Sequence, residues 1–127
     1  MHRLTKYTDI PKAVKIRVLE RDGGRCVLCG TTRAVSPNAH YIPRSALGLG
    51  IDERNIFCAC LRCHNLYDNS PQRRDIKDRL TGYLSWRYGD NWITDEDELK
   101  YHKGMDYVIR QYEYQGGEHG ETESSRI

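Results

Sequence analysis

The sequence contains no long hydrophobic run and little apolar material of any kind. No segment approaches the roughly 18 apolar residues that a membrane-spanning helix needs. The N-terminal stretch MHRLTKYTDIPK also lacks the apolar region of a secretory signal peptide. These absences predict a chain that has no membrane contact and stays in the cytoplasm, where thiols remain reduced.

The chain also has few residues with which to build a hydrophobic core. Only 38% of its 127 residues are hydrophobic, and 30% are charged. A single domain of this length and polarity buries limited apolar surface. An additional staple, such as a metal ion, is therefore expected.

Charge is unevenly distributed, although the formal net charge is only +2. Residues 1–92 hold 16 Lys and Arg against 9 Asp and Glu, whereas residues 93–127 hold 4 against 9. A basic body suits a polyanion such as nucleic acid, but an excess of this size is also compatible with an ordinary solvated surface.

Four of the five cysteines form two C-x-x-C pairs, Cys26 with Cys29 and Cys60 with Cys63. Zinc takes four tetrahedral thiolate ligands, and two such pairs supply them from two chain segments. We therefore predict a structural zinc ion that closes the 30-residue excursion between the pairs. The alternative is a redox pair with buried cysteines. Cys58 is spare and is expected in the core as a small hydrophobe.

Turn signals and apolar spacing predict an α+β fold. They place helices at about 11–22, 61–69 and 70–88, short strands at 37–42 and 56–58, and a further helix start at the acidic run 95–98. Asp9 is the expected N-cap of the first helix. The apolar residues expected to face the core from the helices are Val14, Val18, Leu19, Ile76, Leu80, Tyr83, Leu84 and Trp86. Trp92 is expected to pack against the core rather than to stack on bases.

Two histidines and an asparagine accompany the cysteine pairs. His40 lies on the first predicted strand, Asn55 follows 15 residues later, and His64 follows after 9 more, in a predicted helix. With the segments IPKAVKIRVLERDGGRCVLCG, NAHYIPRS and NIFCACLRCHNLYD, this order resembles the HNH endonucleases of the small phage and prophage type. The resemblance covers about residues 10–70.

The resemblance implies a zinc-stapled ββα-metal core at about 26–70, inside a nuclease domain spanning 1–92. An N-terminal helix belongs to that domain, a C-terminal helical extension at 93–115 would pack on it, and 116–127 would be a disordered tail. The implied activity is metal-dependent hydrolysis of DNA phosphodiester bonds in a bacterial host cell. A monomer would nick and a homodimer would cut both strands. The family also suggests phage terminase and packaging machinery as partners.

The resemblance assigns a role to each polar residue of the motif. His40 would take the proton from the attacking water, and His64 would bind a divalent cation, either Mg²⁺ or Mn²⁺. Asp68 lies on the same helix face and would be a second ligand or would orient His64. Asn55 would hold the loop by backbone hydrogen bonds and thereby fix the angle of His40.

Some positions leave alternatives open. Arg44 would contact a phosphate or the leaving group, or be a solvated loop cation. Ala39 departs from the family, many members of which carry a metal ligand there, and this favours a weaker cation site or a non-catalytic zinc-knuckle module that binds DNA or acts as an adaptor. Cations that would follow a DNA backbone or form a solvated helix face are Arg73, Arg74, Lys77 and Arg79. Histidines expected at the surface are His2, His102 and His119.

Overall fold

The computed structural model describes residues 5–105, and every structural statement below concerns that part of the chain. Its α-helices are α1 (Thr5–Thr8), α2 (Lys12–Asp22), α3 (Leu61–Asn69) and α4 (Arg73–Tyr88), and its strands are β1 (Val35–His40) and β2 (Ile56–Cys60). Three 3-10 helices are η1 (Arg44–Ala46), η2 (Glu53–Asn55) and η3 (Glu96–Leu99). The predicted α+β class is confirmed. None of the described helices is both long and apolar enough to cross a membrane.

The two strands pair antiparallel, and β2 runs directly into α3. The ladder begins at Val35 opposite Cys60 and is interrupted between Ser36 and Ala39. Pro37 lies in the interruption, where its missing N–H costs no ladder bond. Both predicted strands are correct in kind, but β1 starts and ends two residues earlier than predicted, at 35–40, and β2 extends to residue 60.

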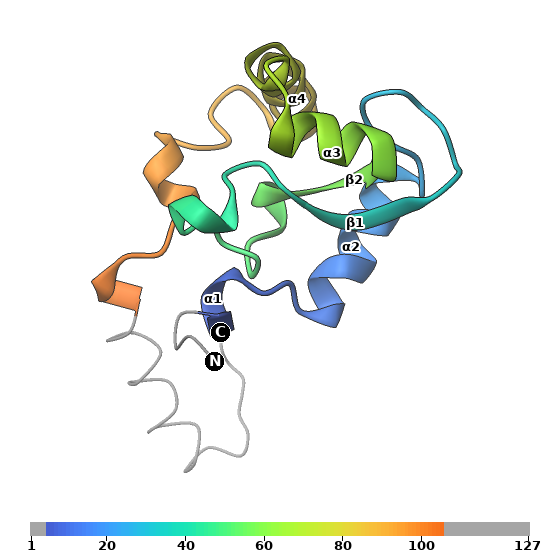
Figure 1. Ribbon diagram of the computed structural model, residues 1–127. Coiled ribbons are helices and arrows are strands. Elements are labelled where there is room, and N and C mark those ends of the chain that lie inside the picture. Colours follow the sequence, from blue (N-terminus) through green and yellow to red (C-terminus); the bar gives the residue numbers. More distant parts are fainter. Residues whose placement is uncertain (1–4, 106–127) are drawn as a thin grey trace.

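Every residue of β2 is buried, because helices cover both faces of the sheet (Figure 1). Ile56 and Cys58 pack with Val14 and Val18 of α2 on one face. Phe57 joins the larger cluster formed with α3 and α4 on the other face. The expectation that Cys58 lies in the core is confirmed. Side chains of β2 thus point alternately to the two faces of the sheet, and they pack against α2 on one face and against α3 and α4 on the other.

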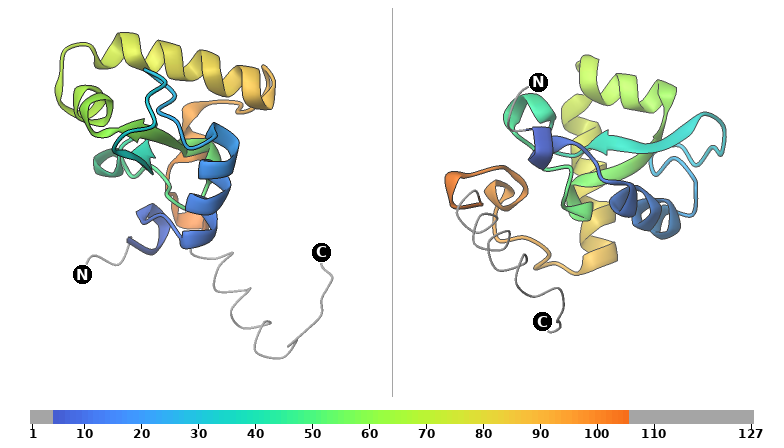
Figure 2. Two further views of the ribbon diagram at one scale, coloured as in Figure 1. Left: turned by 90° about the vertical axis from the view of Figure 1, so that its right-hand side faces the viewer. Right: turned by 90° about the horizontal axis from the view of Figure 1, so that it is seen from below.

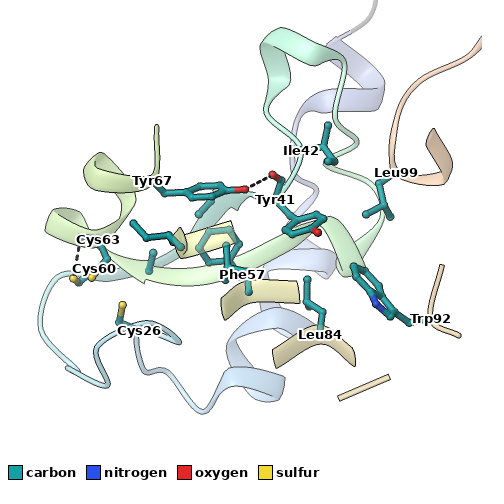
Figure 3. Close-up of a cluster of buried hydrophobic side chains, with 14 residues drawn as sticks. Cys26, Tyr41, Ile42, Phe57, Cys60, Cys63, Tyr67, Leu84, Trp92 and Leu99 are labelled. Atoms are coloured by element: carbon teal, nitrogen blue, oxygen red, sulfur yellow. Dashed lines mark hydrogen bonds between the residues drawn. The ribbon is translucent and has the colours of Figure 1, made fainter. Parts of the chain in front are cut away.

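The larger cluster contains most of the aromatic core (Figure 3). The Tyr67 hydroxyl donates a hydrogen bond to the Tyr41 carbonyl at 2.6 Å, which satisfies a buried polar group. Trp92 packs its ring edge-on to Tyr41, with the ring centroids 5.9 Å apart. Its predicted packing role is therefore confirmed. Leu99 is fully buried in the same cluster.

Three expectations about individual residues are wrong. Asp9 is not a helix cap, because Pro11 occupies the N-cap position of α2. Trp86 is 77% exposed. The buried stripe of α4 consists of Ile76, Leu80 and Leu84, and a residue two places beyond Leu84 points to the opposite side of a helix. Leu19 is 39% exposed, at the edge of the α2 stripe.

Side chains from the end of α2 occupy the edge of β2 that does not face β1. A carboxylate oxygen of Asp22 accepts a hydrogen bond from Cys58 N at 2.9 Å, and Arg21 donates to the Ile56 carbonyl at 2.6 Å. Val27 N donates to the Cys58 carbonyl at 3.0 Å. Arg21 and Asp22 are both buried and are paired at 2.7 Å, which offsets the cost of burying their charges.

The segment after α4 returns to the loop that follows β1. The predicted acidic helix start is a single 3-10 turn, η3, capped by Asp95, whose side chain accepts from Asp97 N at 2.6 Å. Leu49 N donates to the Leu99 carbonyl at 2.8 Å, and Tyr101 N donates to Leu47 O at 2.9 Å. Residues 106–127 lie outside the described part, and with them His119, the end of the expected extension and the expected tail. His2 also lies outside it.

Candidate metal centre and active site

The four paired cysteines meet at one end of the sheet. The sulfur atoms of Cys26, Cys29, Cys60 and Cys63 all lie within 4.8 Å of one another, and those of Cys29 and Cys60 are 3.8 Å apart. Four sulfurs placed about 2.3 Å from a tetrahedral zinc are about 3.8 Å apart. The donor set therefore fits a zinc ion. Four thiolates leave no open coordination position, so such an ion would be structural.

Backbone hydrogen bonds shape both halves of this cluster. In the first half, Gly30 N donates to the Cys26 carbonyl at 2.8 Å, and Gly30 takes the left-handed conformation, with φ 81°, that closes the turn. In the second half, Cys60 caps α3, and its sulfur accepts from Cys63 N at 3.4 Å. Figure 3 shows the sulfurs of Cys26, Cys60 and Cys63 together at one end of the core.

The pKa values of the cysteine thiols bear on whether the cluster can bind a cation. Burial raises the pKa of Cys26, but hydrogen bonding from the backbone at Cys60, Cys29 and Leu28 outweighs burial and lowers that pKa to about 7. Burial and the neighbouring cysteines raise the pKa of Cys63. One ionised thiol thus opposes ionisation of the next, so four thiolates require a metal ion among them. All five cysteines are free thiols.

A second site is a pocket of about 710 Å³, bordered by the segment before α2, by β1 and by α3. Its charged and titratable lining residues are Asp9, Lys15, His40, Arg44, His64 and Asp68. The structure therefore brings four of the residues singled out from the sequence, His40, Arg44, His64 and Asp68, to one pocket. Asp9 and Lys15 were missed, because on the sequence each is explained as an ordinary helix residue.

His40 ends β1 and is only 8% exposed. Its Nε2 lies 2.9 Å from the Thr8 carbonyl oxygen. Because a carbonyl can only accept, Nε2 carries the proton, and in a neutral ring the Nδ1 lone pair is left to take up another. Burial lowers the pKa of His40; the charge of Arg44 also lowers it, while the Thr8 carbonyl opposes the shift. The ring is therefore a neutral base at pH 7.

Asn55 is fully buried and does not line the pocket. Its side-chain nitrogen donates to the carbonyls of Ile42 at 3.1 Å and Leu49 at 2.9 Å, and its side-chain oxygen accepts from Ile42 N at 2.8 Å. Its own carbonyl accepts from Tyr41 N at 2.7 Å. The amide thus closes the loop that begins directly after His40.

His64 and Asp68 form a pair on one face of α3. His64 Nε2 lies 3.1 Å from a carboxylate oxygen of Asp68. A carboxylate this close to the ring is placed where it can orient a metal-binding histidine. The other Asp68 oxygen lies 3.9 Å from Arg73 Nη1.

Ala39 supplies no metal ligand to the pocket. Its side chain is a methyl group, which is fully buried in the larger cluster. Within residues 5–105, the four cysteines are the one group of three or more potential ligands close enough to share an ion. A cation in the pocket would therefore have few protein ligands. Arg44 is ion-paired with Asp9 at the exposed side of the pocket.

Three of the four cations expected to follow a DNA backbone from α4 are engaged within the protein. Arg73 donates to the Tyr67 carbonyl at 2.8 Å, Lys77 pairs with Glu96 at 2.9 Å, and Arg79 donates to Leu28 O at 2.6 Å. Arg74 is exposed. Their positive charge remains, but these contacts hold the side chains to the molecule. His102 is exposed, as expected.

Comparison of the chain with protein-family models, with curated proteins and with solved structures found no match. The functional assignment therefore depends on the residues and geometry described above.

The buried position of His40 predicts a pH dependence. The folded state resists protonation of this ring, whereas the unfolded chain binds the proton near the ordinary pKa of about 6.5. The free energy of unfolding should therefore fall as the pH drops below about 6.5. NMR titration of His40 should give a midpoint below that value. A midpoint above it would contradict the prediction.

Proposed function

We propose that the protein is a metal-dependent HNH endonuclease that hydrolyses DNA phosphodiester bonds. One observation carries the proposal: His40, Arg44, His64 and Asp68 converge on a single pocket, to which β1, η1 and α3 contribute them. The sequence resemblance and the adjoining four-cysteine cluster support it. A phage or prophage origin, and work alongside a terminase, belong to the same proposal and rest on the resemblance alone.

His40 acts as the general base in this scheme. Its neutral ring, with Nε2 bonded to a carbonyl, offers Nδ1 to a water molecule and withdraws a proton as the water attacks phosphorus. Arg44 lies at the same pocket, where its guanidinium can bind a phosphate oxygen. Its partner Asp9 must then yield, which costs little because the pair is half exposed.

His64 is the residue that would hold a divalent cation, with Asp68 orienting its ring. A bound Mg²⁺ or Mn²⁺ would neutralise the charge that develops on the phosphate group during attack. Mg²⁺ in proteins commonly keeps several waters and binds one or two protein groups together with substrate phosphates. The small number of donors in the pocket is compatible with that mode of binding and with weak affinity in the absence of DNA.

Plasmid nicking tests the proposal. Zinc-loaded protein should convert supercoiled DNA to open circles with Mg²⁺ or Mn²⁺, since one site cleaves one strand. His40→Ala should slow nicking about 10²- to 10⁴-fold, the usual contribution of a general base. His102→Ala is the matched control and should nick at the wild-type rate, because His102 is exposed and lies outside the pocket. Intact plasmid with every divalent metal would refute the enzyme, and RNA tested in parallel would show which nucleic acid is preferred.

The second candidate is a zinc-knuckle module that binds DNA, or acts as an adaptor, without cleaving. Ala39 favours it, because its methyl side chain, buried in the core, gives the strand no metal ligand beside His40. Such a module would bind DNA in a salt-sensitive way, and His40→Ala would not change its affinity. Binding without cleavage under all metal conditions would select this candidate over the nuclease.

A further inference from the structure

The hydrogen-bond partner of His40 comes from outside the strand–strand–helix unit. The Thr8 carbonyl belongs to the last residue of α1, 32 positions before His40 in the chain. We propose that the Tyr7–Asp9 segment is a positioning element of the candidate active site: the Thr8 carbonyl fixes the tautomer and orientation of the His40 ring, and Gly50 holds that carbonyl in place. This inference rests on the proposed function and adds residues 7–9, which lie outside the part of the chain that the resemblance covers.

The geometry at His40 gives the carbonyl its effect. In water a neutral imidazole can carry its proton on either nitrogen, and the ring can turn about its bond to Cβ. Here the ring is largely buried, and Nε2 is 2.9 Å from Thr8 O. Turning the ring, or moving the proton to Nδ1, would leave that carbonyl and the ring nitrogen unpaired in a buried place. Nδ1, the ring nitrogen that is not bonded to Thr8, is thereby kept unprotonated and able to accept a proton.

Gly50 lies directly against this carbonyl. A Cβ at residue 50 would lie 2.3 Å from both Thr8 O and Asp9 O, which are backbone atoms that cannot rotate aside. The Gly50 N–H also donates to the Tyr7 carbonyl at 2.8 Å. Figure 2 shows α1 beside the loop that follows β1, as this bond requires. Space, rather than an unusual backbone angle, therefore demands glycine at position 50.

The loop that carries Gly50 is itself held on both sides. The Leu49 carbonyl accepts from the Asn55 side chain at 2.9 Å, and Leu49 N donates to Leu99 O at 2.8 Å. The Asn55 side chain thus closes the loop beside His40. Because it binds Leu49, it also holds the next residue, Gly50, which lies against the Thr8 carbonyl. The orientation of the His40 ring therefore depends on both hydrogen bonds of Leu49, the one with Asn55 and the one with Leu99.

Gly50→Ala is the first test, with Gly82→Ala as the matched control because a Cβ at Gly82 meets nothing within 4 Å. Zinc-loaded full-length protein is labelled with ¹⁵N-histidine, and the ring nitrogen shifts report the tautomer. In the wild type and in Gly82→Ala, His40 should carry its proton on Nε2. In Gly50→Ala that signature should be lost, and nicking should fall about 10- to 100-fold, as expected for a misplaced catalytic group.

Asp9→Pro is the second test and does not depend on the fold tolerating a larger residue at position 50. A proline at position 9 disfavours the helical conformation of Thr8, and so turns its carbonyl away; it also removes the bond from Asp9 N to Thr5 O. Asp9→Ala removes only the carboxylate that pairs with Arg44 and should keep the Nε2 tautomer. The proline variant should lose it while retaining one zinc per chain.

The outcomes separate this inference from the proposed function. A wild-type ring protonated on Nδ1, or unchanged tautomer and nicking in folded Gly50→Ala and Asp9→Pro, would overturn the positioning role even if the protein is a nuclease. If the variants show the expected tautomer changes but the wild-type protein never nicks DNA, the positioning of His40 is supported and the proposed nuclease function is refuted.

Discussion

Replacing Cys63 with alanine should abolish zinc binding and unfold the protein. Cys63 supplies one of the four sulfurs within 4.8 Å of one another, and its loss leaves three ligands and an open coordination position. Structural zinc contributes about 10–16 kcal/mol of apparent free energy in small zinc-finger peptides. The whole stability of a domain is only about 5–15 kcal/mol. Loss of the ion should therefore remove most or all of the folding free energy. Zinc content by elemental analysis and thermal unfolding by circular dichroism measure the effect.

Cys58→Ala is the control for this experiment. Cys58 is as buried as Cys63 but lies under α2, where burial raises the pKa of its thiol to about 12, helped by Asp22. Its replacement removes one buried sulfur and should cost about 0.5–3 kcal/mol, with one zinc per chain retained. If Cys63→Ala kept its metal and its melting temperature, the structural zinc centre would be wrong.

Asn55→Ala should destabilise the protein by several kcal/mol. The substitution leaves Ile42 N, the Ile42 carbonyl and the Leu49 carbonyl without their partner in a fully buried place. Each buried group left unpaired costs about 1–3 kcal/mol. The loop beside His40 should also loosen, so nicking should fall further than the stability loss alone explains. Urea unfolding and plasmid nicking of the still folded fraction measure the two effects.

Asn69→Ala provides the comparison at an exposed asparagine. Its side chain donates one hydrogen bond, to Asn65 at 2.8 Å, and that bond faces solvent. The change in unfolding free energy should stay within about 0.5 kcal/mol. Equal urea midpoints for Asn55→Ala and Asn69→Ala would contradict the supporting role of Asn55.

The sequence alone predicts the features that depend on local spacing. Each C-x-x-C pair places two sulfurs in one turn, the apolar stripe of Val14 and Val18 marks a helix face, and His64 and Asp68, four residues apart, lie on one side of a helix. These follow from the periods of helices and turns, which are properties of short segments. For the same reason the class of the fold could be predicted, and the strand ends only to within two residues.

Most contacts between segments distant in sequence could not be predicted; the meeting of the two cysteine pairs could be, because a zinc ion takes four ligands. Asp9 resembles a helix cap in its local context, and its pairing with Arg44 exists because α1 folds back beside the loop after β1. The four-residue α1 has too few residues to leave a periodic signal. The apolar character of Trp86 predicts an inward position, but its place around α4 exposes it to water. Which side of a helix is buried depends on the elements that pack against it.

The edge of β2 filled by Arg21, Asp22 and Val27 has a consequence for self-association. A two-stranded ribbon normally presents free N–H and carbonyl groups that can recruit a strand from another molecule, the first step toward fibrils. Here Cys58 N and the carbonyls of Ile56 and Cys58 already have partners from the same chain. A guanidinium, a carboxylate and one backbone N–H thus occupy this edge, and a strand from another molecule would have to displace them before it could pair there.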